Sequence, residues 1–301
     1  MVRFLPYIAL AVSLACAQTA QAQDETPVFR SDTNLRVLNT SVVDKNGKLL
    51  TDIPRSAFKV YEDRVEQTLK VFRREDVPVS MGIVIDNSGS MRDKRLKVAA
   101  AAMALVRASN SQDEVFIVNF NDTAFRDQDF TNDTKKLEAA LQRIDSRGGT
   151  AMRDAIGASL DYLKKAGKRD KKVLLVVTDG NDNSSNLTLE QLVRDARQAE
   201  VLIYCIGLLN EEEGGDAKKA RRALKELAAA TGGMDYYPRD LAEVDRITPQ
   251  VAQEIRSQYI LAYSPSNQNL DGSFRRTAVT VTGVKGATAR TSNGYYASPA
   301  K

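Results

Sequence analysis

The sequence predicts an α/β protein with a doubly wound, mostly parallel sheet flanked by helices, and a small β-sandwich-like unit built from the N- and C-terminal flanks. Apolar runs of strand length alternate with helical patterns over residues 80–257, as in a sheet whose parallel strands are joined by helices. Short alternating runs with turn residues lie on both sides of this region, a pattern typical of small β units.

Composition agrees with a globular protein and excludes several kinds of chemistry. The chain has 301 residues, of which 27% are charged and 43% apolar, enough for one sizeable α/β core and a smaller unit. The net charge of +4 forms no basic block with aromatic residues, so nothing favours nucleic-acid binding. There is no histidine, which excludes Ser-His-Asp and Cys-His catalysis and every His-based zinc or iron site.

The first 22 residues have the pattern of a signal peptide. Arg3 is followed by a mostly apolar stretch and then by Ala-Gln-Ala, a small-x-small cleavage site. The apolar stretch is too short to span a bilayer, and no later one is long enough. We therefore expect export to the periplasm or the cell exterior, with no transmembrane segment in the mature chain. Cys16 resembles a lipoprotein anchor, but Ser13 replaces the usual aliphatic residue, so anchoring is the less favoured interpretation.

The two flanks of the central region predict a β frame. Residues 23–34 are polar, and we expect a flexible linker there. Residues 35–75 contain short strand-like runs, with a turn signal at residues 44–48. Strand patterns return in residues 258–297. Because the ends of a domain commonly lie close together, we expect residues 258–297 to pair with residues 35–75.

Between the flanks, residues 79–257 predict the α/β body. The expected strands are 81–86, 114–120, 172–178 and 201–207, with a weaker edge strand at 234–237. The expected helices are 91–108, 134–145, 151–166, 188–199, 216–231 and 240–257. The continuous apolar run over 172–178 is typical of a strand buried on both faces. Cys205 lies in an apolar strand, so we expect a small core residue rather than a nucleophile.

The first strand of the body ends in a group of oxygen-bearing side chains. The apolar run before it stops at Asp86, and Ser88 and Ser90 follow at spacings of two. Loops at the carboxyl ends of parallel strands are where open α/β folds bind ligands. Oxygen ligands suit a hard cation such as Mg²⁺. The alternative is that Ser88 or Ser90 only caps the following helix.

Two distant segments favour the metal site over the helix cap. A glycine-containing turn carries Thr150 just before a helix, and the strand over 172–178 ends at Asp179. Three loops would then supply oxygens from Asp86, Ser88, Ser90, Thr150 and Asp179. The sequence therefore predicts a site for Mg²⁺ or Mn²⁺, with Ca²⁺ less favoured.

These five residues resemble the metal-ion-dependent adhesion site of von Willebrand factor type A domains, which consists of a DxSxS loop, a later Thr and a later Asp. The resemblance implies that fold over residues 79–257. It implies that Ser88, Ser90 and Thr150 are hydroxyl ligands and that Asp86 and Asp179 act directly or through water. It further implies a protein partner whose Asp or Glu carboxylate completes the coordination.

The flanks also resemble a family, the exported bacterial VWFA-related domain proteins. The similarity covers roughly residues 33–297 and rests on four motifs: Phe58-Lys59-Val60-Tyr61-Glu62-Asp63, Gln258-Tyr259-Ile260-Leu261-Ala262-Tyr263-Ser264-Pro265, Phe274-Arg275 and Gly294-Tyr295-Tyr296. Arg64 is a departure, because that family usually has Gly after the Glu-Asp pair. This departure concerns a local turn only.

Other function classes are open but less favoured. A hydrolase could use the same cation with Asp86 or Asp179 as base, yet the sequence offers no histidine, no evident nucleophile and no second metal cluster, so we expect no enzyme. A scaffold is also conceivable, in which the metal is structural and the β frame makes the contacts.

Two nearby acidic patterns carry less weight than the five site residues. Asp154 could support the metal site, although an acid in the first turn of a helix is favoured by the helix dipole alone, and we prefer that interpretation. Part of a calcium-loop pattern begins at Asp179, but Ser184 replaces its required glycine, so we regard the match as coincidence.

Overall fold

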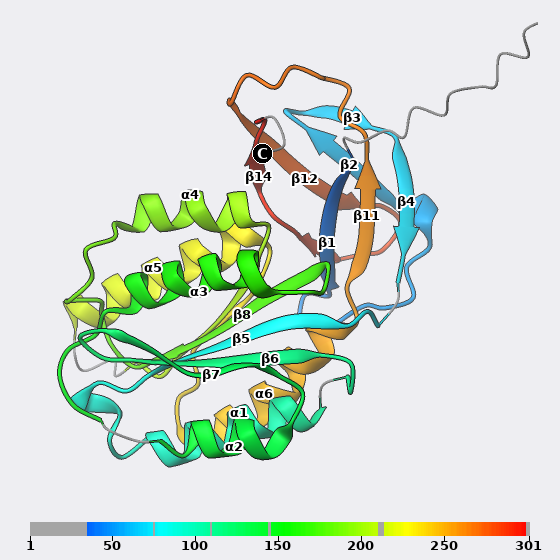
Figure 1. Ribbon diagram of the computed structural model, residues 1–301. Coiled ribbons are helices and arrows are strands. Elements are labelled where there is room, and N and C mark those ends of the chain that lie inside the picture. Colours follow the sequence, from blue (N-terminus) through cyan, green and yellow to red (C-terminus); the bar gives the residue numbers. More distant parts are fainter. Residues whose placement is uncertain (1–34, 75, 109, 144–145, 210–213, 299–301) are drawn as a thin grey trace, which may run out of the picture. The chain divides into compact units, whose positions relative to one another are not determined.

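The described chain consists of a six-stranded sheet with helices on both faces, and of two further sheets with four strands each (Figure 1). The structure is a computed structural model that describes residues 35–298 except 75, 109, 144, 145 and 210–213. The predicted signal peptide (1–22), with Cys16, and the predicted linker (23–34) lie outside the described residues. The α/β fold class expected from the sequence is confirmed.

The six-stranded sheet has the order β10-β9-β8-β5-β6-β7. Its strands are β5 (Val79–Asp86), β6 (Glu114–Phe120), β7 (Ala124–Thr131), β8 (Lys171–Thr178), β9 (Leu202–Gly207) and β10 (Asp235–Tyr236). Only β7 runs antiparallel to its neighbour; the other described pairs in this sheet are parallel. All eight residues of β5 are buried, as its apolar sequence predicts for a strand covered on both faces.

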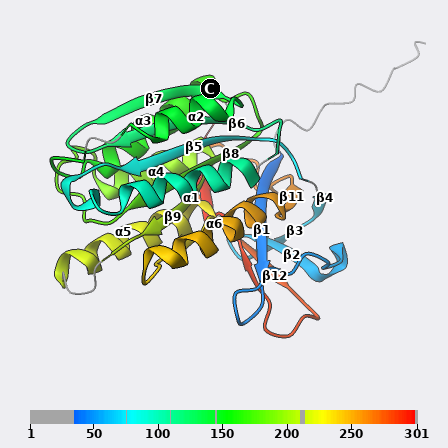
Figure 2. The same ribbon diagram turned by 90° about the horizontal axis from the view of Figure 1, so that it is seen from below.

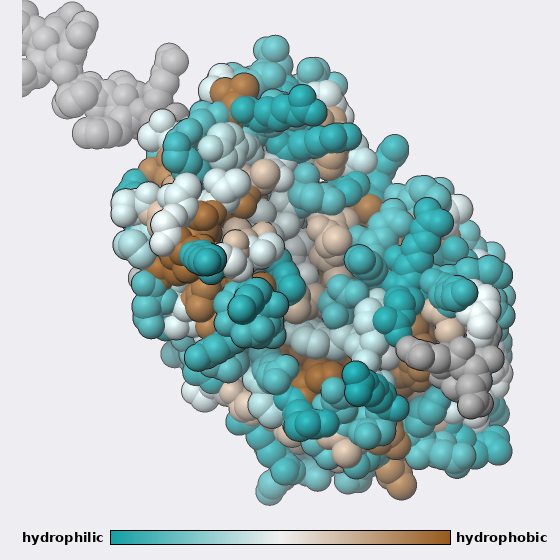
Figure 3. Space-filling model, turned by 180° about the vertical axis from the view of Figure 1, so that it is seen from behind, coloured by the Kyte–Doolittle hydropathy of each residue, from teal (hydrophilic) through white to brown (hydrophobic). Residues whose placement is uncertain are grey.

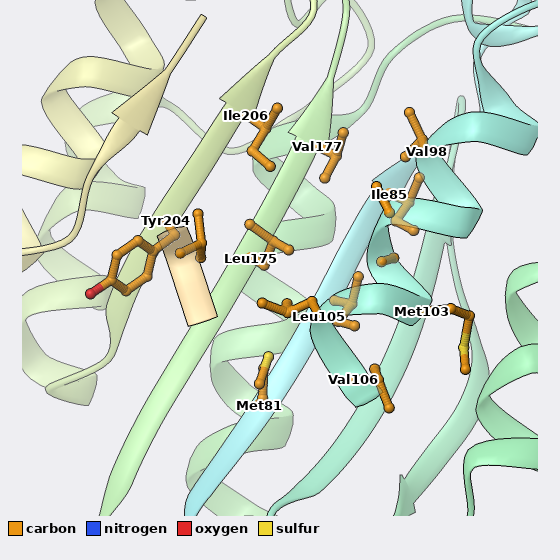
Figure 4. Close-up of a cluster of buried hydrophobic side chains, with 14 of the residues drawn as sticks. Met81, Ile85, Val98, Met103, Leu105, Val106, Leu175, Val177, Tyr204 and Ile206 are labelled. Carbon is orange, nitrogen blue, oxygen red and sulfur yellow. The ribbon is translucent and has the colours of Figure 1, made fainter. Parts of the chain in front are cut away.

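Three helices cover each face of this sheet. The helices on one face are α1 (Arg95–Ala108), α2 (Thr134–Leu141) and α6 (Leu241–Arg256); those on the other are α3 (Met152–Ala166), α4 (Leu189–Ala199) and α5 (Gly215–Thr231) (Figures 1 and 2). Figure 4 shows the first of these two cores, where Met81, Ile85 and Leu175 of the sheet face Leu105 and Val98 of α1. Each of these five side chains is at most 2% exposed.

The two flanks of the chain pair with each other in the remaining sheets. One sheet has the order β13-β1-β11-β4 and the other β14-β12-β2-β3. The N-terminal strands are β1 (Arg36–Val43), β2 (Phe58–Glu62), β3 (Val65–Gln67) and β4 (Leu69–Arg73). The C-terminal strands are β11 (Tyr259–Tyr263), β12 (Phe274–Val281), β13 (Thr288–Arg290) and β14 (Gly294–Tyr296). β1 runs antiparallel to β11, and β2 antiparallel to β12, and these sheets share a core that includes Phe58, Leu261 and Tyr259.

The frame and the α/β body are joined by a buried contact as well as by the chain. Helix α6 ends at Arg256, and β11 of the frame begins three residues later. Between them, buried Gln258 donates hydrogen bonds to Ser41 Oγ (3.1 Å) on β1 and to Tyr204 Oη (3.2 Å) on β9. The end of α6 is therefore tied to both parts.

The surface is mostly polar. The face in Figure 3 is largely hydrophilic, with hydrophobic residues in a few separate patches. Among the described residues, no helix has the length and apolar character needed to cross a membrane.

The structure differs from the sequence-based expectation at three places. β7 was not predicted. It is an edge strand with a partner strand on one side only, so much of it stays exposed and it is rich in polar residues. Helix α1 begins at Arg95 rather than at residue 91, since Gly89–Met91 form a separate 3₁₀ turn. Helix α2 ends at Leu141, four residues before the expected end.

The turn between β2 and β3 contains Arg64, where the resembling family usually has glycine. Arg64 has a φ of 70°, in the left-handed region that glycine prefers.

Candidate metal centre

The carboxylate of Asp86 is held in a fixed orientation at the carboxyl end of β5. Its Oδ1 accepts a hydrogen bond from the backbone N–H of Ser88 (2.8 Å), and its Oδ2 accepts one from the hydroxyl of Thr178 (2.6 Å). Thr178 is the last residue of β8, which pairs in parallel with β5. Asp86 is completely buried, so the parallel register of the two strands fixes where its oxygens lie.

A chain of hydroxyl groups connects the first loop with Asp179. Ser90 Oγ donates to Asp179 Oδ1 at 2.8 Å, although the two residues are 89 positions apart. Ser88 Oγ lies 3.1 Å from Ser90 Oγ. Because a serine hydroxyl has a single proton and that of Ser90 is directed at Asp179, Ser88 is the donor in the second bond.

Thr150 is brought to the same place by the loop before α3. The backbone N–H of Gly89 donates to the carbonyl of Gly148 at 3.3 Å, which joins this loop to the loop after β5. On the other side, a β-carbon built on Gly180 would stand 3.7 Å from Thr150 Oγ1. Thr150 is 4% exposed. The loop that carries Thr150 therefore contacts the loop after β5, and the Thr150 hydroxyl lies close to Gly180, the residue after Asp179.

The segment after Asp179 holds Thr150 in place through contacts that the sequence did not reveal. The backbone N–H of Thr150 donates to Asn183 Oδ1 (2.9 Å), and its carbonyl accepts from the backbone N–H of Asn183 (3.1 Å). The carboxylate of Asp154 accepts from the backbone N–H groups of Asn186 (3.0 Å) and Leu187 (2.8 Å). Asp154 thus anchors a loop, in addition to lying in the first turn of α3.

The structure therefore brings all five predicted residues together. Four of them, the two carboxylates and the hydroxyls of Ser88 and Thr150, are at most 4% exposed. Ser90 is exposed and lies on the side of the site that opens to solvent.

Burial and repulsion from Asp179 both raise the pKa of Asp86. Removal from water raises the pKa of Asp86 from its ordinary value of 3.8 to about 6. Hydrogen bonds from Thr178 and Ser88 lower this pKa, and the nearby charge of Asp179 raises it further. A cation at the site would relieve both effects, because it favours the ionised carboxylates.

One cationic side chain already contacts the site. Lys94 Nζ lies 2.6 Å from Asp179 Oδ2. The side chain of Lys94 is 30% exposed, whereas that of Asp179 is 1% exposed. No sequence pattern indicated this contact, since Lys94 lies in the turn before α1, in a segment that we expected to be helical.

The residues fit a hard divalent cation. The donors are carboxylate and hydroxyl oxygens, which suit Mg²⁺ and Mn²⁺ rather than soft metals. The ammonium of Lys94 against Asp179 shows that this position attracts positive charge. No group of three or more His, Cys, Asp or Glu side chains with metal-binding geometry occurs in the described part of the chain. A site here would thus depend on the hydroxyls as well as on the two carboxylates.

A groove in the structure lies away from this site. It has a volume of about 830 Å³ and is lined by one face of β1, β4 and β11 and by residues 168–172. None of the five site residues lines it. The mostly basic segment 168–172 forms one wall of this groove.

Comparison with known proteins finds a family that is similar over the region of the site. The family described as von Willebrand factor type A domain matches residues 81–181, which include all five site residues. Calcium-activated chloride channel regulator 1 of Equus caballus is 27% identical over 170 residues, or 54% of this chain and 17% of that protein. Integrin alpha-11 of Mus musculus is 33% identical over 105 residues, or 33% of this chain and 9% of that protein. The chain thus spans less than a fifth of the length of these relatives.

A solved structure extends the likeness beyond the matched range. A von Willebrand factor type A protein from Catenulispora acidiphila has a TM-score of 0.51 with this chain and is 15% identical. The alignment covers 87% of this chain and 73% of that one. At this identity the likeness concerns the fold.

Proposed function

We propose that the chain is an exported, non-enzymatic module that binds a protein partner through a divalent cation, and the match of residues 81–181 to the von Willebrand factor type A family supports this proposal. Asp86, Ser88, Ser90, Thr150 and Asp179 would hold Mg²⁺ or Mn²⁺. The partner would present an Asp or Glu carboxylate. Export would follow from the signal peptide predicted over residues 1–22 and would place the module in the periplasm or outside the cell.

The observation that carries this proposal is the convergence of oxygens from three loops. Ser90, Asp179 and Thr150 are far apart in the sequence, yet a 2.8 Å hydrogen bond joins the first two and Thr150 lies beside them. A helix cap would explain a serine next to a helix. It would not explain a serine of one loop that bonds the carboxylate of another.

The carboxylates and the hydroxyls of the site would have different roles in binding a cation. Asp86 and Asp179 supply negative charge, and their fixed hydrogen bonds preorganise the site. The hydroxyls of Ser88, Ser90 and Thr150 are neutral, so they would bind a cation without cancelling its charge. When bound, the cation would supply a positive centre that attracts an acidic group. The exposed side at Ser90 is where a partner could approach.

A capture experiment with a matched variant tests this function. The purified mature chain is immobilised and exposed to exported or surface proteins of its native cell, in Mg²⁺ or in EDTA. We expect a partner that is retained in Mg²⁺, released by EDTA and lost with Ser90→Ala. Ser56→Ala, which removes an exposed serine of the β frame, should retain it. A partner bound equally in Mg²⁺ and EDTA would contradict the proposal.

One observation favours the second candidate function, a scaffold that binds through its β frame. The 830 Å³ groove combines an apolar sheet face, with Val37 55% exposed, and basic residues such as Lys168 and Lys172. Retention of a partner in EDTA would support this scaffold. Turnover of phosphoester or peptide substrates by the pure protein would instead revive the hydrolase, for which the described site offers no nucleophile other than its own serine and threonine hydroxyls.

A further inference from the structure

We propose that Lys94 is a built-in competitor for the metal site: its ammonium neutralises Asp179 in the metal-free protein and leaves that carboxylate when a divalent cation is bound. This inference rests on the proposed function, because it assigns a regulatory residue to the same site. It concerns how strongly the chain binds the cation and not which partner it recognises.

The contact between Lys94 and Asp179 is close and partly shielded from water. At 2.6 Å the distance is that of a charge-assisted hydrogen bond. The carboxylate side is almost fully buried, and only 30% of the lysine side chain is exposed. Such a pair is screened less by solvent than a pair on the open surface.

The backbone holds Lys94 at the site while its side chain remains able to move. Its N–H donates to the carbonyl of Met91 (3.0 Å), and its own carbonyl accepts from Val98 (3.1 Å) in the first turn of α1. Four flexible methylene groups separate this fixed backbone from the ammonium. The partial exposure of the side chain provides a path to solvent, so the ammonium can leave without unfolding the turn.

Both oxygens of Asp179 accept hydrogen bonds in the structure. Ser90 donates to Oδ1, and Lys94 donates to Oδ2. A divalent cation bound through Asp179 would stand within a few ångströms of the ammonium, and two positive charges at that range repel each other. Binding therefore has to include movement of Lys94, which lowers the affinity of the site.

Two other basic residues near the site make their hydrogen bonds or ion pairs with residues outside the five. Arg95, the next residue, is completely buried and donates to Asn119 Oδ1 on β6. Arg153 pairs with Asp182 at 2.9 Å. Lys94 forms an ion pair with one of the five site residues, whereas these polar partners of Arg95 and Arg153 lie outside the five.

Removing the ammonium should have opposite effects on the two states of the protein. Metal-stripped Lys94→Met is expected to unfold at a lower temperature than the wild type, because Asp179 loses its partner. The same variant should bind Mg²⁺ about tenfold more tightly, because repulsion and displacement of the lysine are gone. A lysine with a merely structural role would lower stability without raising affinity.

The experiment measures Mg²⁺ affinity by isothermal titration calorimetry and the thermal midpoint of metal-stripped protein for each full-length mature variant. Lys94→Gln is a second neutral variant, in case Lys94→Met does not fold. Lys94→Arg keeps the charge and should restore the weaker affinity. Lys97→Met is the matched control, since Lys97 lies three residues along and makes an exposed ion pair with Asp245 (3.7 Å); its affinity should stay within about twofold of the wild type.

The outcomes separate this inference from the proposed function. If the wild type binds Mg²⁺ and the neutral Lys94 variants bind it equally or more weakly, the competitor role is overturned and the metal site stands. If neither the wild type nor the neutral variants bind Mg²⁺, both proposals fail. Tighter binding by Lys94→Met and Lys94→Gln, together with a lower thermal midpoint, supports the competitor role.

Discussion

Asp86 is the most deeply buried of the five site residues. Its side chain is completely buried, and the backbone of Ser88 and the hydroxyl of Thr178 hold its two oxygens. A carboxylate that is buried beside a second one destabilises the metal-free fold, as the pKa of about 6 indicates. A residue that costs stability and is held so firmly is typical of a binding site.

The raised pKa of Asp86 predicts how metal-free stability depends on pH. Because the folded-state pKa of about 6 lies above the ordinary 3.8, the folded state binds this proton more tightly than the unfolded state does. Tighter proton binding stabilises the folded state by about 3 kcal/mol for a shift of about two pKa units. This stabilisation is fully present below about pH 4 and is lost as the pH rises through 6. We expect metal-stripped Asp86→Asn to lack this loss and to exceed the wild type by about 1–3 kcal/mol at pH 8.

Urea unfolding of metal-stripped protein at pH 5 and pH 8, followed by circular dichroism, measures this difference. Asp113→Asn is the control, because Asp113 is also a buried carboxylate but accepts from Val79 and Asn110 at the amino end of β5. Added Mg²⁺ should stabilise Asp113→Asn and leave Asp86→Asn unchanged. An Asp86→Asn protein that is less stable than the wild type at pH 8 would contradict this account of Asp86.

At the residue scale, the sequence singled out five candidate residues but not the residues that position them. Asp86, Ser88 and Ser90 stand in one short motif, and Asp179 directly follows an apolar strand. Thr178, Lys94 and Asn183 have no such pattern. Their roles follow from which strands are neighbours and from where a turn directs a side chain, and both are tertiary properties. This list of positioning residues is therefore a result of the structure.

At the scale of elements, the loop that carries Thr150 depends on a glycine. Gly148 has a φ of 73°, and a β-carbon there would lie 2.0 Å from Asp122 Oδ2. The other oxygen of Asp122 accepts from the backbone N–H of Gly149 at 2.7 Å. A side chain at Gly148 would therefore push against the group that anchors the loop next to Thr150.

Gly148→Ala is accordingly expected to weaken Mg²⁺ binding about tenfold and to cost more than the roughly 1–2 kcal/mol of left-handed strain alone. The control is Gly47→Ala, because Gly47 has a similar φ of 80° in the β frame but no atom within 4 Å of an added β-carbon. It should show the strain without any change in metal affinity. Calorimetry and urea unfolding of both variants check this, and equal Mg²⁺ affinity in the two would show that the loop does not depend on Gly148.

The elements that the sequence predicted best are the ones with the strongest burial. β5 and β8 are continuous apolar runs, and the structure covers both with helices on each face. β7 was missed because an edge strand needs no apolar alternation on its open side. The start of α1 was placed too early because buried Met91 continues the helical spacing, although it belongs to a 3₁₀ turn. Apolar patterns in a sequence indicate which residues are buried, but they do not indicate which backbone conformation buries them.

At the scale of the whole molecule, the motifs of the two flanks meet in one buried cluster. Glu62 of β2 accepts hydrogen bonds from the hydroxyls of Tyr263 (2.8 Å) and Tyr295 (2.9 Å). Arg275 lies 3.7 Å from the same carboxylate, and both charged side chains are 3% exposed. The family resemblance had singled out segments that contain these residues, but only the structure shows that they satisfy one another. The cluster ties strands from the two ends of the chain into one frame.

The central claim is also a property of the whole molecule, because it requires loops from three parts of the chain to bind one ion. Calorimetric titration of metal-stripped mature protein with Mg²⁺ tests it most directly, with Thr150→Val to remove one hydroxyl at nearly constant volume and Thr280→Val, an exposed position of β12, as the control. We predict one Mg²⁺ per chain for the wild type and Thr280→Val, and binding at least tenfold weaker for Thr150→Val. Absence of Mg²⁺ binding by the wild type, or equal affinity in Thr150→Val, would contradict the account.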